Sequence, residues 1–204
     1  IYSKRADGTG TVEQLSDGVD GSPSSITPDG AHILFRSRER IGMLSLDDER
    51  SSRILLADDF IQRNGEVSPD GRWLAYESNE SGQFEIYVRS FPDVEAGRWQ
   101  ISTSGGTRPL WSPNGRELYY LGLDNRLMAA PVEIRESFQP GTPERLLDKG
   151  YYLGPPGRPY DIAPDGERFL MLERVRGDEE MSRPPSFTLV LNWLEELKER
   201  VPPR

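Results

Sequence analysis

The chain has 204 residues, with 25 basic and 34 acidic side chains and a formal net charge of −9. A protein that binds nucleic acid needs basic surface to neutralise phosphate, so this balance argues against nucleic acid as a partner. The sequence has no cysteine and one histidine, His32, which excludes disulfides, thiolate metal ligands and sites built on several histidines.

The hydrophobic segments are short. None approaches the ~18 apolar residues that a membrane helix needs. The opening residues do not form a charged region followed by an apolar core, as a signal peptide would. We therefore expect a soluble chain without direct membrane insertion. The sequence does not decide between a cytoplasmic and an extracytoplasmic location.

The first twenty residues predict part of a small β-sheet. Two short extended segments, 1–4 and 12–15, flank a turn at Asp7-Gly8-Thr9-Gly10. They resemble the last two strands of a four-stranded unit whose first two strands are missing. Segment 12–15 could instead pair with the last unit of the chain and close a ring.

A Pro-Asp/Asn-Gly turn then recurs four times, with proline-to-proline spacings of 41, 44 and 51 residues. Proline presets φ at the second turn position and glycine closes the turn, so each motif is typical of a hairpin between antiparallel strands. Strand repeats of ~40–50 residues are characteristic of propeller blades. The turns are Thr27-Pro28-Asp29-Gly30, Ser68-Pro69-Asp70-Gly71, Ser112-Pro113-Asn114-Gly115 and Ala163-Pro164-Asp165-Gly166.

The strands around these turns predict an all-β propeller of four to five four-stranded blades. Apolar residues alternate in the same phase after each turn, as on a buried strand. The predicted domain is a partial blade at 1–20, blades at 21–57, 58–102 and 103–148, and a blade at 149–193 that lacks its last strand. A short helix at 192–201 follows, with Asn192 as its N-cap and leucines at helical spacing.

Two segments of the second repeat carry a family resemblance. The run Ser68-Pro69-Asp70-Gly71-Arg72-Trp73-Leu74-Ala75-Tyr76, followed by Glu85-Ile86-Tyr87-Val88, resembles the TolB-type, WD-like propeller repeats of bacterial proteins. The ending 190–198 looks like the C-terminus of bacterial proteins that join a serine/threonine kinase domain to such a propeller. The resemblance implies a ligand- or protein-binding scaffold, here a fragment of a larger protein. No kinase motif is present in the sequence.

Two carboxylates occupy equivalent positions, three residues before the turn proline, in non-adjacent repeats. These are Glu66 and Asp161, where the other repeats have Ser25 and Leu110. First strands line the channel of a propeller, so both should face it. Carboxylate oxygens suit a hard divalent cation, which makes Glu66 and Asp161 a candidate metal site. The alternative is that both are solvated or ion-paired channel residues.

The sequence offers three candidate catalytic residues. His32, Glu66 and Asp161 are the candidates for chemistry at such a metal. His32 follows its turn at a position where the other repeats carry Trp73, Glu117 and Arg168, a mixed set typical of a surface site. A serine triad would need this one imidazole, and the sequence has no Gly-x-Ser-x-Gly elbow.

A long connection before the last repeat is the strongest candidate binding segment. It spans 150–160 and holds three tyrosines, glycine hinges and a proline pair. Expanded loops of repeat scaffolds often gather on the binding face, and tyrosine and arginine are favoured at interfaces. The predicted ligand- or partner-binding residues are Tyr151, Tyr152, Arg158, Tyr160 and, from the preceding repeat, Arg108.

Three functions remain open at this stage. The leading prediction is a non-catalytic binding module, whose ligand is a protein or a small molecule. The alternative is a metal-dependent hydrolase of esters, lactones or phosphotriesters, with one divalent metal ion as cofactor in the channel. A third possibility is self-association into a homo-oligomer through open blade edges.

Overall fold

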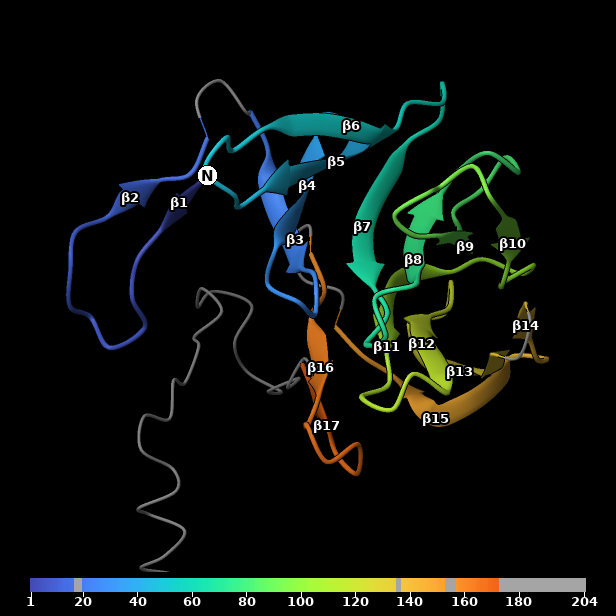
Figure 1. The fold of residues 1–204 in the computed structure, drawn as a ribbon. Helices are drawn as coiled ribbons and strands as arrows, with labels where there is room; N and C mark the ends of the chain where they lie inside the picture. The colour runs from blue at the N-terminus through green and yellow to red at the C-terminus, as the bar shows by residue number, and fades with distance from the viewer. Residues whose placement is uncertain (17–19, 135–136, 153–156, 173–204) are drawn as a thin grey trace, which may run out of the picture. The chain divides into compact units, whose positions relative to one another are not determined.

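The structure is a computed structural model that describes residues 1–16, 20–134, 137–152 and 157–172 (Figure 1). The chain divides into two compact units, 1–174 and 175–204, and every described residue belongs to the first. The described residues form 17 strands and no helix, as expected for an all-β chain. None of them forms a helix that could span a membrane. The last part of the blade predicted at 149–193 and the helix predicted at 192–201 lie outside the described residues.

Three sheets have the architecture of propeller blades, with antiparallel strands joined in chain order. We call them blades 1, 2 and 3. Blade 1 contains β3 (Ser22–Ile26), β4 (His32–Ser37), β5 (Arg40–Ser45) and β6 (Ser52–Leu56). Blade 2 contains β7 (Gln62–Val67), β8 (Trp73–Ser78), β9 (Glu85–Ser90) and β10 (Arg98–Gln100).

Blade 3 departs from the four-strand plan. It contains β11 (Thr107–Trp111), β12 (Glu117–Leu121), β13 (Arg126–Ile134), β14 (Phe138–Pro140) and β15 (Glu144–Gly150). The nine-residue β13 is long enough to pair with two strands, β15 along its first half and β14 along its end. The sequence pattern predicted β15 and missed β14.

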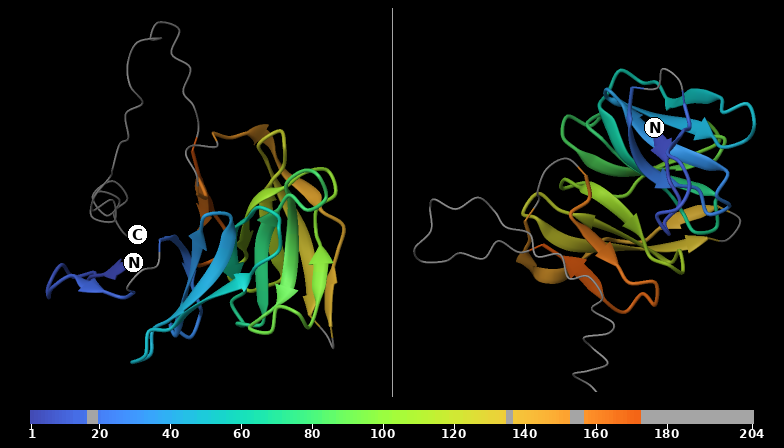
Figure 2. Two further views of the ribbon diagram at one scale, coloured as in Figure 1. Left: turned by 90° about the horizontal axis from the view of Figure 1, so that it is seen from above. Right: turned by 90° about the vertical axis from the view of Figure 1, so that its left-hand side faces the viewer.

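Two further sheets have two strands each. One joins β1 (Tyr2–Ser3) to β2 (Glu13–Gln14), and the other joins β16 (Tyr160–Ile162) to β17 (Phe169–Met171). The pairing described for β2 is therefore with β1, and not with the last blade. The β16–β17 sheet, drawn in orange in Figure 2, contains the turn of the last repeat and lies within the blade predicted at 149–193.

The repeated turns fold alike in all four repeats. The glycine amide donates to the carbonyl of the first turn residue over 2.8–2.9 Å, and each glycine has φ between 69° and 75°, where a Cβ would be strained. Ser68 shows the additional side-chain contacts. Its Oγ donates to Asp70 Oδ1 at 2.5 Å and accepts from the Trp73 amide at 3.0 Å. Ser112 and Asn114 reproduce the first of these contacts at 2.8 Å.

The core lies between the blades. Leu34 of blade 1 packs with Leu74 and Tyr76 of blade 2. On the other face of β8, Trp73 and Ala75 pack against the next blade. The strand β8 is thus covered on both faces, so its consecutive residues are all buried and apolar area is removed from water on each side. This stacking fixes the position of each first strand beside the next, β3 beside β7 and β7 beside β11.

Candidate functional site

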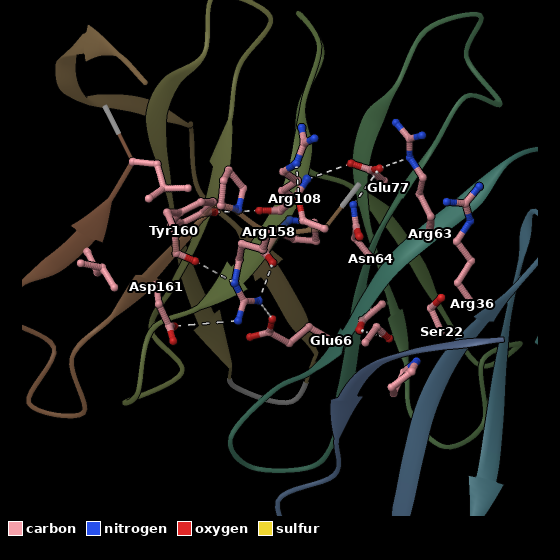
Figure 3. A pocket seen from close by; sticks show the side chains of 18 residues that line it. Ser22, Arg36, Arg63, Asn64, Glu66, Glu77, Arg108, Arg158, Tyr160 and Asp161 are labelled. Carbon is pink, nitrogen blue, oxygen red and sulfur yellow. Dashed lines mark hydrogen bonds and ion pairs between the residues drawn. The ribbon is translucent and has the colours of Figure 1, made fainter. Parts of the chain in front are cut away.

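The first strands of the four repeats surround one cavity of about 740 Å³, drawn in Figure 3. Its walls come from β3, β7, β11 and β16, the ends of β4 and β8, the segment before β16, and Leu170 and Leu172 in and after β17. Most of the lining side chains that can be seen there are charged or polar. The expectation that Glu66 and Asp161 would face a common channel agrees with this geometry, because both line the cavity.

A recurring irregularity shapes this wall. The strand register shifts inside β3, β7 and β11, in each case near the start of the strand. In β7 and β11 the bulge contains a residue other than glycine in the left-handed region, Asn64 with φ 54° and Arg108 with φ 59°. The other such residues, Arg38, Arg50 and Asn125, lie in connections between strands. Strained backbone of this kind is often found at functional sites, where it aims a side chain.

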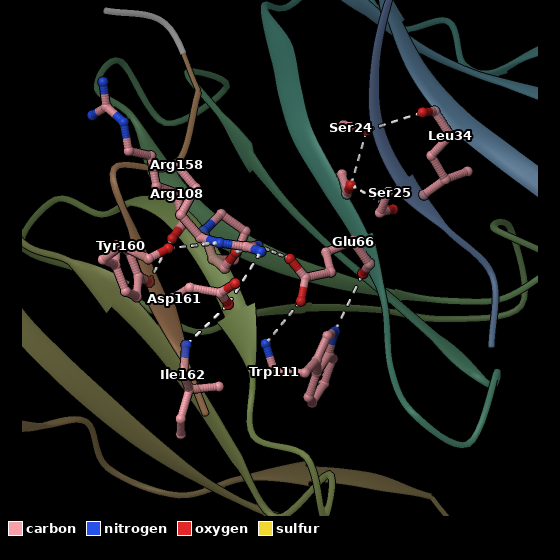
Figure 4. A network of polar contacts seen from close by, with 12 residues as sticks. Ser24, Ser25, Leu34, Glu66, Arg108, Trp111, Arg158, Tyr160, Asp161 and Ile162 are labelled. Atoms are coloured by element: carbon pink, nitrogen blue, oxygen red, sulfur yellow. Dashed lines mark hydrogen bonds and ion pairs between the residues drawn. The ribbon is translucent and has the colours of Figure 1, made fainter. Parts of the chain in front are cut away.

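Arg158 connects the two carboxylates that the sequence singled out. Its guanidinium forms an ion pair with Glu66, and its Nη2 lies 3.9 Å from Asp161 Oδ1 (Figure 4). It also donates to the Tyr160 carbonyl at 3.2 Å. Glu66 Oε1 accepts from the Trp111 amide at 3.3 Å, so the carboxylate is held from both sides.

Burial raises the pKa of the Glu66 carboxyl above its ordinary value, and Arg158 offsets only part of that effect. Burial also raises the pKa of the Tyr160 hydroxyl well above its ordinary value. That hydroxyl donates to the Arg108 carbonyl at 2.7 Å. Tyr160 therefore acts at this site as a buried clamp between β16 and β11.

A second carboxylate organises the opposite wall. The Glu77 side chain is 0% exposed and forms an ion pair with Arg63. Glu77 also accepts from Asn64 Nδ2 at 3.0 Å and from the Arg108 amide at 2.8 Å. Glu77 thus holds both bulges in place. A buried carboxylate needs such partners, because removing it from water is costly.

Two arginines in the cavity have donors to spare. Arg36 Nε donates to the Arg38 carbonyl at 2.7 Å, and Arg108 Nε donates to the Gly157 carbonyl at 2.6 Å. Within the described ranges, neither guanidinium forms an ion pair. Burial lowers the pKa of Arg108, the nearby Glu77 opposes part of that shift, and the neighbouring Arg63 adds to it. The cavity lining contains four arginines against three carboxylates, in a chain of net charge −9.

The predicted binding residues divide into two groups. Arg108, Arg158 and Tyr160 line the cavity, whereas Tyr151 and Tyr152 are not part of its wall. The Tyr151 amide donates to Asn125, and the Tyr152 amide to Leu172, next to β17. His32 lies at the opposite end of β4 from Arg36 and is also outside the cavity wall.

Sequence reasoning missed Arg36, Arg63 and Glu77. Arg36 and Glu77 belong to second strands, β4 and β8, whereas channel residues were predicted on first strands. Arg63 lies on the first strand β7, but not at the position three residues before the turn proline. Arg36 pairs across the sheet with Ser22, at the start of a first strand. Knowledge of this strand register would have identified Arg36 as a residue near the cavity.

Metal binding at Glu66 and Asp161 stays a prediction. A cation there would have to displace the Arg158 guanidinium from both carboxylates. Across the described part of the chain, no three His, Cys, Asp or Glu residues come together as a ready ligand set.

The fold is that of a TolB-type β-propeller, which solved structures establish. The chain has a TM-score of 0.62 and 17% identity to TolB from Acinetobacter baumannii, covering 85% of this chain and 42% of that one. The comparison with a candidate TolB from Agrobacterium tumefaciens gives a TM-score of 0.58 and 20% identity, covering 72% of this chain and 55% of that one. The comparison with a candidate 6-phosphogluconolactonase from Bacteroides uniformis gives a TM-score of 0.55 and 20% identity, covering 85% of this chain and 57% of that one.

These likenesses confirm the predicted fold class and extend no further, because identities at this level show architecture alone. The chain spans about half the length of these solved structures. No protein-family model and no curated protein sequence matches the chain.

Proposed function

We propose that this chain is a non-catalytic binding module whose ligand occupies the central cavity. The observation that carries the proposal is the convergence of four first strands on one open, polar cavity with pre-arranged walls. Concave sites with a few convergent polar groups are the usual form of a ligand pocket. Propellers commonly place such sites on the channel, which is where these strands meet.

Pre-organisation supports this function. Arg158, Glu66 and Glu77 are each held by several partners from more than one blade. The serine side chains add a further tie, because Ser24 and Ser25 both donate to the Gly65 carbonyl at 3.1 Å (Figure 4). Fixed walls reduce the ordering cost of binding.

The test is affinity selection from a mixed library. It contains end-blocked hexapeptides of acidic, basic and uncharged composition, neutral sugars, and mono- and dicarboxylic acids. The wild type is compared with Ser22→Trp, which fills the cavity from an exposed wall position, and with Ser51→Trp, an exposed control outside it. Ligands retained by the wild type and Ser51→Trp but lost in Ser22→Trp support the proposal. Retention unaffected by Ser22→Trp, or no retention at all, contradicts it.

A metal-dependent hydrolase is the second candidate. Its support is the pair Glu66 and Asp161 in the cavity, together with the name of the structure from Bacteroides uniformis. It predicts turnover of esters, lactones or phosphotriesters on addition of Ca²⁺, Mn²⁺ or Zn²⁺, lost in Glu66→Ala and Asp161→Ala. Turnover in the wild type that survives both substitutions would contradict this site.

Self-association through blade edges also stays a proposal. It predicts a solution mass that is a multiple of the chain mass of 23.1 kDa in light scattering. A strictly monomeric species contradicts it.

A further inference from the structure

The cavity receives one arginine from each repeat. Arg63 lies on β7 and Arg108 on β11, at the beginnings of two first strands. Arg158 comes just before β16. Blade 1 supplies Arg36 from β4, directly across the sheet from Ser22 at the start of β3. All four line the same cavity, as Figure 3 shows.

Internal carboxylates neutralise two of these arginines. Arg158 pairs with Glu66 and approaches Asp161, and Arg63 pairs with Glu77. These ion pairs compensate charges that would otherwise be unpaired in a partly enclosed site, where an unpaired charge is costly. They also fix the positions of the walls around the other two arginines.

Arg36 and Arg108 lack a carboxylate partner within the described residues. Each uses its Nε on a backbone carbonyl, which orients the guanidinium. Arg108 Nη1 also lies 3.5 Å from Thr107 Oγ1, so the N–H groups of its Nη2, together with the terminal N–H groups of Arg36, are available for a ligand. Arg108 is further positioned by its left-handed backbone and by the Glu77 contact to its amide. Glu77 also stabilises the Arg108 charge through space, but it forms no direct ion pair with the guanidinium.

We propose that the ligand of this cavity carries an oxyanion, a carboxylate or a phosphate, bound by the guanidinium groups of Arg36 and Arg108. The inference rests on the proposed function and names the chemical class of its ligand. Guanidinium groups form strong charge-assisted hydrogen bonds to both kinds of oxyanion. Ser22 lines the cavity across the sheet from Arg36, and its hydroxyl can donate to the same ligand.

Electrostatics supports the choice of an anion. The cavity lining carries one positive charge in excess, although the whole chain is strongly acidic. An anion between Arg63, Arg108 and Arg36 would relieve the mutual repulsion of like charges. In a partly enclosed site such interactions are screened less than on the surface.

The experiment is isothermal titration calorimetry with citrate and with inorganic pyrophosphate at low ionic strength. The first probe presents carboxylates and the second presents phosphates. The variants are Arg108→Ala and Arg36→Ala, and the matched control is Arg116→Ala. Arg116 belongs to the same blade as Arg108, is exposed and lies outside the cavity wall. The control removes the same charge, so it separates local binding from a change in net charge.

We expect at least one probe to bind the wild type and Arg116→Ala equally. Arg108→Ala and Arg36→Ala should each weaken that binding about tenfold or more, as for a charged hydrogen bond. Arg108→Lys should fall between wild type and alanine, because lysine keeps the charge and loses the planar fork. Thermal melting establishes that each variant is folded, and Arg36→Ala provides an independent reading if Arg108→Ala does not fold.

Binding of neither probe overturns the inference, as does binding that Arg116→Ala weakens as much as Arg108→Ala. The two proposals can fail separately. If uncharged or basic library members bind in a way that Ser22→Trp abolishes, while citrate and pyrophosphate do not bind, the cavity is a binding site and the oxyanion assignment is wrong. If no library member binds, the proposed function fails as well.

Discussion

The backbone amide of Arg108 donates a hydrogen bond of 2.8 Å to Oε2 of the buried Glu77. The two residues belong to β11 and β8, so this bond joins blade 3 to blade 2 at the cavity wall. Glu77 also contacts Arg63 and Asn64 of β7. One carboxylate therefore connects three strands, and it does so at the two bulges that aim residues into the cavity.

Removing this carboxylate should destabilise the protein. Glu77→Ala leaves three donors without their acceptor, and a buried charge network that loses one partner typically costs about 3–5 kcal/mol. Glu77→Gln should cost less, because its amide oxygen still accepts one hydrogen bond. Urea unfolding measures both variants, with the exposed Glu49→Ala as the control. A free energy of unfolding for Glu77→Ala within about 0.5 kcal/mol of the control would contradict this role.

The repeated turn yields a second prediction, at Ser68. Its buried hydroxyl accepts from the Trp73 amide and donates to Asp70. In Ser68→Ala the Trp73 amide loses that acceptor, which should cost about 1–3 kcal/mol. Ser51→Ala, on an exposed serine, should be close to neutral in the same unfolding experiment. Equal stability of the two variants would show that the backbone alone holds the turn.

Glu66 should give the protein a pH dependence of defined sign. Burial raises the pKa of its carboxyl in the folded chain, so the unfolded chain ionises Glu66 at lower pH than the folded chain does. As pH rises from the ordinary glutamate pKa through the raised one, ionisation favours the unfolded chain and the contribution of Glu66 to stability falls. The unfolding free energy of wild type minus that of Glu66→Gln should therefore decrease over this window.

The measurement is urea unfolding of both proteins at several values between about pH 4 and about pH 8. A difference that increases with pH would mean that the Arg158 ion pair outweighs burial, and that the folded state lowers the pKa of Glu66. The same data would then favour reading the Glu66–Arg158 pair as a stabilising clamp.

Local patterns in the sequence were enough to predict the blades. The four turns repeat the same chemistry at Pro28, Pro69, Pro113 and Pro164, and the strands that follow the first three are largely buried between sheets. The phase of the first strands was less reliable. Ile26, Val67 and Trp111 are apolar residues at one equivalent position, two residues before the turn proline. Val67 and Trp111 are buried, whereas Ile26 is 61% exposed, because burial there depends on what packs beside the strand and not on its own alternation.

The candidate site could be predicted only in part. Glu66 and Asp161 were found because one position in each first strand faces the channel. Their partner Arg158 was predicted to bind ligand, which stays a prediction, and the sequence did not indicate that its guanidinium would also pair with these two carboxylates. Glu77 carries no local signal, since its role comes from two bulges on other strands. Long-range register of this kind is not visible in a single repeat.

The most direct test of oxyanion binding in the cavity is a crystal structure of the protein with citrate or pyrophosphate, whichever binds more tightly. We predict that the anion lies in the cavity, with its oxygens within hydrogen-bond distance of the Arg36 and Arg108 guanidinium groups and with Arg158 still paired to Glu66. An anion bound elsewhere, such as the smaller hollow between Ser112 and Gly166, with the cavity free of ligand, would contradict it.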